Sequence, residues 1–477
     1  MRTWQLVAGS AVTGLALAAS AVVAAGPWDS GQRTAERDRA TAHARAGGAD
    51  HGERPVPRPA PSAPGVLAAL GPNGAQQANP ADPADARPAA LAAALEPLLA
   101  DPALGDLSTA SVVDTASGRV LFEAGARRPM TPASTIKIAT AAAALSALGP
   151  EHRIATTVVP GPVPGGIVLV GGGDPSLTAR KKAPAGSGGS LVALAADTAE
   201  ALKAAGTTAV TLGYDDSLYS GPAVHPIGID NDNIAPVSAL TADQGRPDDS
   251  FSGPVDRSKD PARDATRAFA ALLREHGVTV TGTPARAKAP AGATPLAATH
   301  STPLAGLVER MLTHSDNDIA EALARQTALA SGQPAGFEGA EKAVAARLAA
   351  LGLDLSGSRF ADGSGLNRAD KVSAGLLTAL LAKAADPAQP RLRPVLTGLP
   401  VAGFSGTLRA RNAADSPAAG LVRAKTGTLT QVNSLAGTVV TPSGRLLSFA
   451  FLASGSTDPG AAEKALDALA SAVATTS

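Results

Sequence analysis

The fold is decided by the stretch Thr131-Pro-Ala-Ser-Thr-Ile-Lys-Ile-Ala-Thr140, which holds a serine and a lysine three residues apart. Thr131 can cap the N-terminus of a helix, and Pro132 suits the first helical position, where no backbone N–H is needed. The residues that follow are mostly Ala, Leu and Ile as far as about residue 147. This composition is apolar on nearly every side, so we expect a buried helix.

Ser134 and Lys137 are candidates for a nucleophile and its base. At this spacing in a helix, the two side chains leave the same face one turn apart. Burial would lower the pKa of the lysine because it disfavours the charged form, and a neutral amine can take a proton from a hydroxyl. N–H groups at the helix N-terminus would favour a developing oxyanion. Taken alone, the pair is more simply explained as polar residues near a helix start.

Two other short motifs change that weighing. Ser315-Asp316-Asn317 stands on the loop before a predicted helix, Asp318–Arg325, where polar residues ordinarily act as caps. Lys425-Thr426-Gly427-Thr428 ends a predicted strand and offers a cation and two hydroxyls to a carboxylate. Gly427 has no side chain, so a ligand could lie against the strand edge. Each motif has a plain structural explanation, but S-x-x-K, S-x-N and K-T-G each occur once, in that order.

The three motifs together resemble the signature of class A β-lactamases and penicillin-binding proteins. Within that group the chain is similar to the D-Ala-D-Ala carboxypeptidase/endopeptidase family (class C, low molecular mass) over roughly residues 91–475. Three further stretches carry this resemblance: Gly171-Gly-Gly-Asp-Pro-Ser-Leu177, Asp215-Asp-Ser-Leu-Tyr-Ser-Gly-Pro222 and Asp362-Gly-Ser-Gly-Leu-Asn-Arg368. The 178 positions from Lys137 to Ser315 favour it over the class A β-lactamases, which as a family hold these motifs far closer.

The resemblance implies a fold of the α/β (α+β) class, β-lactamase/transpeptidase-like, in which helices flank a five-stranded antiparallel sheet and a mixed α/β domain is inserted. The residues themselves predict the strands, with one hairpin over residues 108–122, a second over residues 434–452 and a strand at residues 421–425. Periodicity alone does not show that the two ends of the chain share one sheet.

We assign residues 91–150 and 300–477 to a penicillin-binding/transpeptidase-like catalytic domain and residues 151–299 to the inserted domain. Alternating and helical patterns in the insert predict strands at 154–159, 167–170, 209–212 and 278–280, and helices at about 190–205 and 261–276. The polar segment Ala242–Arg263 stands where the best-known members of the family nest a third domain. We therefore expect a shorter insert here.

The N-terminal part is predicted to be an export segment followed by a linker. Arg2 precedes an uncharged apolar stretch, from about Leu6 to Ala25, that ends in small residues. Residues 1–27 are thus expected to be a signal peptide or a retained membrane anchor. Residues 28–90 are Pro/Ala-rich without periodicity, which predicts a disordered linker. Either alternative places the remaining chain outside the cytoplasm, in reach of a cell wall.

Composition excludes several other classes of function. The formal net charge is zero and aromatic residues make up 3%, so we expect no nucleic-acid partner. The chain has no cysteine, which excludes disulfides, thiolate metal sites and cysteine nucleophiles. The seven histidines show no ligand spacing, so we expect neither a metal nor a cofactor.

The resemblance implies a catalytic role for the residues of the first two motifs. Ser134 would attack the carbonyl of the terminal D-Ala-D-Ala bond, and Lys137 would take its proton. Which group is the base in the wider superfamily is disputed, and no second carboxylate motif is visible here, which favours Lys137. Ser315 would relay a proton to the leaving D-Ala nitrogen, and Asn317 would hold the substrate amide.

The third motif is implied to bind the end of the substrate. Lys425 would supply positive charge near the terminal carboxylate and Ser315, while Thr426 and Thr428 would hydrogen-bond that carboxylate beside Gly427. The backbone N–H groups of Ser134 and Thr428 would form the oxyanion hole.

We therefore expect a serine D-Ala-D-Ala carboxypeptidase, a D,D-endopeptidase, or both, acting on peptidoglycan stem peptides through an acyl-enzyme on Ser134. β-Lactams, which mimic the scissile amide, would acylate the same hydroxyl. Transfer to an amine is chemically the same second step, so transpeptidation stays open. Two alternatives are a β-lactamase or esterase on the same fold and a catalytically idle envelope-binding protein. Cleavage of the N-terminal segment, the oligomeric state and the function of the insert also stay open.

Overall fold

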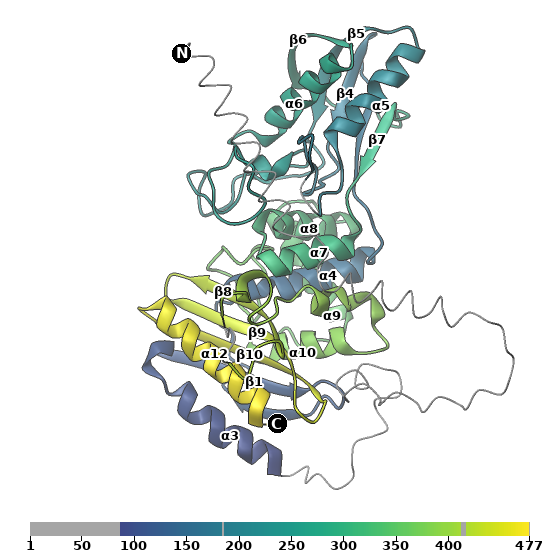
Figure 1. Cartoon of the computed structure of the whole chain (residues 1–477). Helices are drawn as coiled ribbons and strands as arrows, with labels where there is room; N and C mark the ends of the chain where they lie inside the picture. The colour runs from purple at the N-terminus through teal and green to yellow at the C-terminus, as the bar shows by residue number, and fades with distance from the viewer. Residues whose placement is uncertain (1–85, 184–185, 412–415, 477) are drawn as a thin grey trace, which may run out of the picture. The chain divides into compact units, whose positions relative to one another are not determined.

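The computed structural model describes residues 86–183, 186–411 and 416–476 (Figure 1). The predicted signal or anchor, residues 1–27, and most of the predicted linker lie outside these residues. The linker prediction was wrong at its end, because helix α3 (Ala86–Leu99) begins five residues before residue 91. Pro88 falls in the first turn of this helix, where a proline is tolerated. Among the described residues, no helix is both long and apolar enough to cross a bilayer.

One sheet joins the two ends of the described chain. Its five antiparallel strands have the order β2-β1-β10-β9-β8. Their bounds are Leu107–Asp114 (β1), Val120–Ala124 (β2), Val422–Leu429 (β8), Val432–Val440 (β9) and Leu446–Ser454 (β10). Strand β1 pairs with β10 from Leu107↔Ser454 to Asp114↔Leu447, so the N-terminal and C-terminal hairpins share one sheet. The predicted five-stranded antiparallel sheet is thereby confirmed, and β8 is one of its two edges.

The two faces of this sheet carry different helices (Figure 1). Phe449 and Phe451 point to the face covered by α3 and α12, whereas Ala450 and Leu452 point to the face covered by α10 and α4, as period-two alternation requires. The helices of this part are α4 (Lys137–Leu148), α7 (Leu304–His314), α8 (Asn317–Ala330), α9 (Phe337–Ala350), α10 (Ala374–Ala385), α11 (Pro394–Thr397) and α12 (Pro459–Thr476). Helix α4 is buried from Lys137 to Leu145, as its apolar composition predicts.

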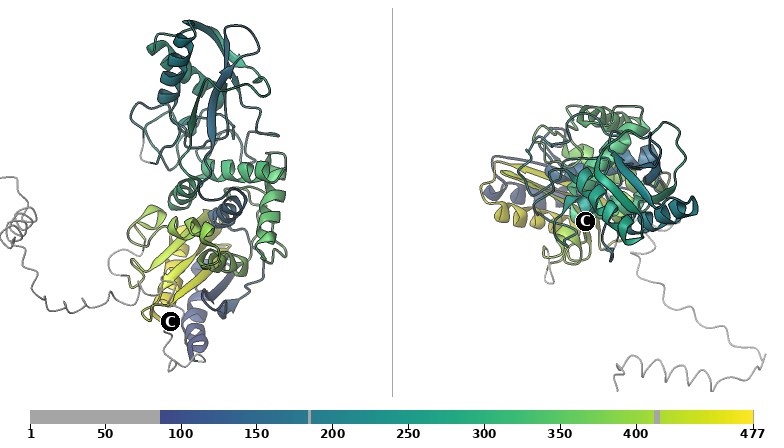
Figure 2. Two further views of the ribbon diagram at one scale, coloured as in Figure 1. Left: turned by 90° about the vertical axis from the view of Figure 1, so that its right-hand side faces the viewer. Right: turned by 90° about the horizontal axis from the view of Figure 1, so that it is seen from above.

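A second five-stranded sheet lies between these chain ends in the sequence. Its order is β6-β5-β4-β3-β7, with β5 parallel to both β4 and β6 and β3 antiparallel to β4 and β7. The strands are β3 (Ala155–Pro160), β4 (Gly166–Val170), β5 (Ala209–Asp215), β6 (Thr279–Arg286) and β7 (Ala297–His300). Helices α5 (Leu191–Ala204) and α6 (Pro261–Glu275) pack together against it, as the views in Figure 2 also show. Strand β7 was missed because its four residues, two alanines followed by Thr299 and His300, show no apolar alternation.

A polar segment between β5 and α6 contacts the helices that carry the second motif. Apart from one 3-10 turn, Asp243–Gly245, residues 216–260 have no regular element. The amide of Gln244 donates to Asp316 Oδ2 at 2.7 Å, and Asn317 Nδ2 donates to the Asn233 carbonyl at 3.1 Å. This segment therefore supplies direct contacts to residues at the start of α8.

We predict that Phe449→Ala destabilises the fold strongly, because this side chain is fully buried and stacks on Phe451 with ring centroids 5.3 Å apart. Loss of a buried aromatic ring typically costs about 3–5 kcal/mol. Urea unfolding would measure the change, with Val120→Ala, at a residue that is 49% exposed, as the control. Equal effects of the two substitutions would contradict this assignment of the core.

Candidate active site

Ser134 lies on a strained turn and not inside a continuous helix. Residues Ala133–Ile136 form a 3-10 turn that leads directly into α4 at Lys137. The predicted capping by Thr131 is wrong, because its hydroxyl donates to the Arg368 carbonyl at 3.3 Å and the turn has no side-chain cap. Ala133 has a φ of 48°, a left-handed conformation that costs a non-glycine residue about 1–2 kcal/mol. This residue interrupts the expected helix immediately before the serine.

The strained turn is held by a glycine from a distant loop. Gly365 has a φ of 85° and packs against the backbone of Ala133. A Cβ atom on Gly365 would collide with the Ala133 carbonyl oxygen and would lie 3.0 Å from Ile136 Cγ2. The loop from Asp362 to Asp370 can approach Ser134 this closely only because position 365 has no side chain.

The amine of Lys137 connects the first two motifs. It lies 2.9 Å from Ser134 Oγ, 2.7 Å from Asn317 Oδ1 and 2.5 Å from the Ser364 carbonyl oxygen. The lysine is fully buried. In the neutral form an amine has two N–H groups and one lone pair. Because the two carbonyl oxygens can only accept hydrogen bonds, they take both N–H groups and leave the lone pair facing the Ser134 hydroxyl.

Burial also sets the charge state of this amine. Desolvation lowers the pKa of Lys137 to about 8, although the negative charges of Asp362 and Asp316 act in the opposite direction. An amine with a pKa of about 8 is partly neutral near neutral pH, which is what a general base requires. The lysine at the start of a buried, alanine-rich helix is therefore chemically prepared to accept a proton.

The second motif lies where the predicted loop ends. Ser315 has a left-handed backbone (φ 57°, ψ 38°), and Asp316 caps α8 by accepting from the Ile319 N–H at 2.9 Å. Asn317 is already the first residue of α8, so the loop prediction was wrong for this residue. The Ser315 hydroxyl has no hydrogen-bond partner among the described residues, which leaves it available to a ligand.

The third motif lies on the edge strand β8, directly against the serine turn. A Cβ atom on Gly427 would lie 2.7 Å from the Pro132 carbonyl oxygen and 3.1 Å from the Ser134 nitrogen. The absence of a side chain at Gly427 therefore lets the strand pack on the turn. From the sequence we expected this absence to make room for a ligand. The structure thus brings Gly427 close to the candidate nucleophile.

Lys425 is the second fully buried lysine of the site. Its amine donates to the Thr426 carbonyl at 2.8 Å. Desolvation, together with the positive charges of Lys137 and Arg411, holds the pKa of Lys425 well below its ordinary value. The effect of the Lys137 charge on Lys425 places the third motif within electrostatic range of the first.

The two threonines of the third motif face the open edge of the sheet. The Ala424 N–H donates to the Pro400 carbonyl, away from β9, so the N–H groups of Thr426 and Thr428 point to the same outer side. Their hydroxyls donate to Thr407 Oγ1 at 2.9 Å and to Glu463 Oε1 at 3.3 Å, respectively. Both hydroxyls would have to turn away from these neighbours to bind a substrate carboxylate.

Sequence reasoning missed two contributors to the site, Ser364 and Glu321. Ser364 acts through its backbone carbonyl, which no residue pattern reveals, although its stretch had been noted for the resemblance. Glu321 is fully buried one turn after Asn317 in α8, and its Oε1 accepts from the N–H groups of Gly363 and Ser364 at 2.9 and 3.0 Å. A carboxylate within the otherwise apolar segment Ile319–Ala324 was the sequence feature that could have pointed to it.

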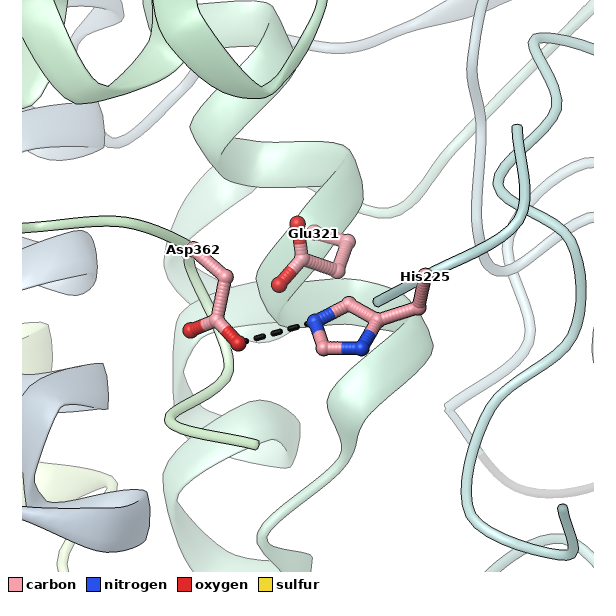
Figure 3. A group of neighbouring side chains, drawn as sticks. All are labelled: His225, Glu321 and Asp362. Carbon is pink, nitrogen blue, oxygen red and sulfur yellow. Dashed lines mark hydrogen bonds and ion pairs between the residues drawn. The ribbon is translucent and has the colours of Figure 1, made fainter. Parts of the chain in front are cut away.

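One group of side chains could in principle hold a metal ion (Figure 3). His225, Glu321 and Asp362 are buried, and their ligand atoms lie within 4.8 Å of one another. Both oxygens of Asp362 accept hydrogen bonds from the chain, however, and Glu321 Oε2 lies 3.1 Å from the Arg325 guanidinium. A cation would have to displace these bonds and share the site with Arg325, so the residues fit a hydrogen-bonded network better than a metal centre.

Comparison with known families agrees with this geometry. The sequence profile of the D-Ala-D-Ala carboxypeptidase 3 (S13) family matches residues 91–253 and 247–475. A carboxypeptidase DacB of Mycolicibacterium smegmatis is 41% identical over 390 residues, covering 80% of this chain and 83% of the relative. A D-alanyl-D-alanine carboxypeptidase of Actinomadura is 31% identical over 455 residues, with 76% and 81% covered. The chain belongs to this family and is an enzyme of the D-Ala-D-Ala carboxypeptidase type, as the resemblance predicted.

A solved structure shares the fold. Penicillin binding protein 4 of Haemophilus influenzae superposes with a TM-score of 0.63 at 22% identity, covering 79% of this chain and 97% of that structure. The predicted β-lactamase/transpeptidase-like fold is thereby confirmed.

We predict that Gly365→Ala is more destabilising than its backbone conformation alone would cause. Alanine with a φ of 85° costs about 1–2 kcal/mol, and the collision with Ala133 adds to this cost. Gly332→Ala is the matched control, since Gly332 has a φ of 69° and nothing within 4 Å of the added methyl group. Urea unfolding of the two variants should show a clearly larger loss for Gly365→Ala, and equal losses would contradict the contact with the serine turn.

Proposed function

We propose that this enzyme removes the terminal D-Ala from peptidoglycan stem peptides through an acyl-enzyme on Ser134. The observation that carries the proposal is the 2.9 Å contact between Ser134 Oγ and the buried Lys137 amine. In the neutral form of Lys137, the oxygens of Asn317 and Ser364 take both N–H groups of the amine, so its lone pair faces the Ser134 hydroxyl. A serine beside a correctly oriented neutral amine is an activated nucleophile.

In the acylation step, Ser134 Oγ forms a bond to the carbonyl carbon of the penultimate D-Ala, and its proton passes to Lys137 Nζ. The carbonyl oxygen becomes an oxyanion, for which the N–H groups of Ser134 and Thr428 are the proposed donors. Collapse of this intermediate breaks the C–N bond. The leaving D-Ala nitrogen receives a proton through Ser315, whose hydroxyl is free in the described structure.

Deacylation repeats the chemistry with water as the nucleophile. Water attacks the ester carbon of the acyl-enzyme, Lys137 takes a proton from the water, and the C–O bond to Ser134 breaks. The hydroxyl is restored, and the shortened peptide leaves with a new carboxylate. Asn317 would hold the substrate amide near Lys137 during both steps, because its own amide lies at the start of α8 beside the amine.

The edge of β8 is the proposed binding surface for the end of the peptide. An extended peptide can pair with the outward N–H and C=O groups of Thr426 and Thr428, as in other cases of strand addition. The terminal carboxylate would take the hydroxyls of these threonines, with Lys425 supplying charge. Packing of Gly427 on the serine turn keeps this edge close to the nucleophile.

We further propose that β-lactams acylate Ser134, since their strained amide mimics the scissile bond. A structure of the Haemophilus influenzae protein is of a complex with a β-lactam. The same acyl-enzyme chemistry would cleave a D-Ala-to-diamino-acid cross-link, so D,D-endopeptidase activity is part of the proposal.

We also propose the domain arrangement and the location. The first sheet uses strands from residues 91–150 and 300–477, which supports a catalytic domain there, and the second sheet supports an inserted domain at residues 151–299. The family profile matches this chain in two parts that meet at residues 247–253, inside the polar segment Ala242–Arg263, which supports a shorter insert. A peptidoglycan substrate requires a location outside the cytoplasm, and the apolar stretch from Leu6 to Ala25 supports export, cleaved or anchored.

Replacement of the nucleophile tests this function directly. Ser134→Ala should abolish covalent labelling by a fluorescent penicillin and reduce D-Ala release from diacetyl-L-Lys-D-Ala-D-Ala by roughly a million-fold, as in other serine peptidases. Ser146→Ala, on the same helix α4, should behave as the wild type. Labelling that persists in Ser134→Ala would remove this serine from its role, and a cross-linked muropeptide offered in parallel reports endopeptidase activity.

The acylation rate should depend on the charge of Lys137. Only the neutral amine can accept a proton, so with a pKa of about 8 the rate constant should rise about tenfold per pH unit below pH 7 and level off above pH 9. Stopped-flow labelling between pH 6 and 10 would measure it. In Lys425→Arg the second cation stays charged throughout, so the same rising limb should remain. A flat profile in both proteins would mean that another group is the base.

A further inference from the structure

His225 links the inserted segment to a loop of the catalytic site. It lies between β5 and α6, is 2% exposed, and packs edge-on against Phe337 with ring centroids 5.5 Å apart. Its Nε2 lies 2.9 Å from Asp362 Oδ2 (Figure 3). The Ile227 N–H approaches Nδ1 at 3.3 Å, so Nδ1 accepts and Nε2 carries the proton that is donated to Asp362.

Asp362 in turn fixes the loop that follows it. Its Oδ1 accepts from the N–H groups of Ser364 and Gly365 at 3.0 and 2.6 Å, and its Oδ2 accepts from the Asn367 N–H at 2.7 Å as well as from His225. Burial opposes the negative charge, but these hydrogen bonds hold the pKa of Asp362 at about 2. An ionised carboxylate with several donors of this kind gives its loop a single conformation.

The loop delivers one group to the catalytic lysine. The N–H of Ser364 is held by Asp362 and Glu321, and the N–H of Gly365, which shares a peptide unit with the Ser364 carbonyl, is held by Asp362 at 2.6 Å, so the peptide units on both sides of Ser364 are oriented. Its carbonyl oxygen accepts from Lys137 Nζ at 2.5 Å. Four residues from three separate parts of the chain therefore form a continuous path, His225 to Asp362 to Ser364 to Lys137. Nothing in the acyl-transfer chemistry described above uses the first two.

We propose that His225 and Asp362 are positioning residues that hold the Ser364 carbonyl against Lys137 and thereby direct the lysine lone pair at Ser134. The proposal rests on the function proposed above, in which Lys137 is the base. It makes the inserted segment a part of the catalytic apparatus, because the insert supplies the imidazole. The imidazole acts as a hydrogen-bond donor through Nε2, and it does not touch the substrate.

The charges around the amine make the role measurable. Lys137 is faced by Asp316 and Glu321 from α8 and its cap, by Asp362 and Asp370 from the loop, and by Lys425 from β8. Replacing His225 removes none of these groups. If the Ser364 carbonyl moves away, the ammonium form of Lys137 loses an acceptor, so its pKa should fall. If the Ser364 carbonyl is no longer positioned, the maximal acylation rate should therefore be lower and the rising limb of the pH–rate profile should move to lower pH.

The test compares three variants of the full chain. His225→Phe keeps a ring of similar shape but removes the donor, His225→Gln retains an N–H donor on a flexible side chain, and Phe337→Leu disturbs the ring packing and keeps the donor. Penicillin acylation rates from pH 6 to 10 and melting temperatures are measured for each. We expect His225→Phe to lower the maximal rate by up to about a hundredfold and to shift its rising limb to lower pH. His225→Gln should recover most of the rate, and Phe337→Leu should keep the wild-type profile.

A crystal structure of His225→Phe provides a readout that does not depend on activity. The Ser364 carbonyl should lie beyond hydrogen-bond distance of Lys137 Nζ. An unchanged distance, an unchanged pH profile, or the same loss in Phe337→Leu would overturn the positioning role. Failure of the proposed function is distinguishable, because it would appear as labelling of Ser134→Ala or as a wild-type enzyme without acylation, whatever the position of the loop.

Discussion

The arrangement of the site depends on one buried amine with three oxygen neighbours. Lys137 has a pKa of about 8 in place of 10.5, which favours its neutral form by about 3 kcal/mol relative to water. Neutrality alone would not suffice, because an amine that rotates freely could direct its lone pair anywhere. Hydrogen bonds to the Asn317 and Ser364 oxygens remove that freedom, so the lone pair of the neutral amine points at the Ser134 hydroxyl. The surrounding fold is therefore constrained to deliver two acceptors and one hydroxyl to a single point.

Burial of this amine is made tolerable by what surrounds it. Helix α4 is built mostly of alanine, which lets α8, α9 and α10 approach closely and exclude water. The cost of desolvating Lys137 is offset by the carboxylates of Asp316, Glu321 and Asp362. Lys425 is also buried, and repulsion between its charge and that of Lys137 disfavours protonation of both lysines together. The site thus lowers the pKa of both lysines below their ordinary values. The close contacts of Gly365 and Gly427 permit the necessary approach of backbone to backbone.

The sequence predicted the parts of this arrangement that depend on side-chain type and period. Both hairpins, the buried helix that follows Ser134 and the three motifs follow from alternation, apolar composition and spacing, and the shared sheet followed from the resemblance. It could not predict the turn at Ala133, because alanine gives no sign of a positive φ that only tertiary contacts impose. It also could not predict Ser364, which acts through its backbone, or the purpose of Gly427, which serves packing. The histidines were set aside together because they show no ligand spacing, and the partner of His225, Asp362, is 137 residues away.

Helix α8 explains why contributions from such distant segments agree. Asn317 and Glu321 are four residues apart and so project from one face of the helix. The Asn317 oxygen accepts a hydrogen bond from Lys137. Glu321 accepts from the N–H of Ser364, the residue whose carbonyl oxygen is the second acceptor. Both acceptors of the Lys137 amine therefore belong to residues that α8 carries or contacts, and a shift of α8 would move them together. His225 approaches this system from the insert and acts on the loop, the one part that α8 does not hold by itself. A donor from the segment between β5 and α6 is needed there because a glycine-rich loop has no conformational preference strong enough to place a carbonyl oxygen without external contacts.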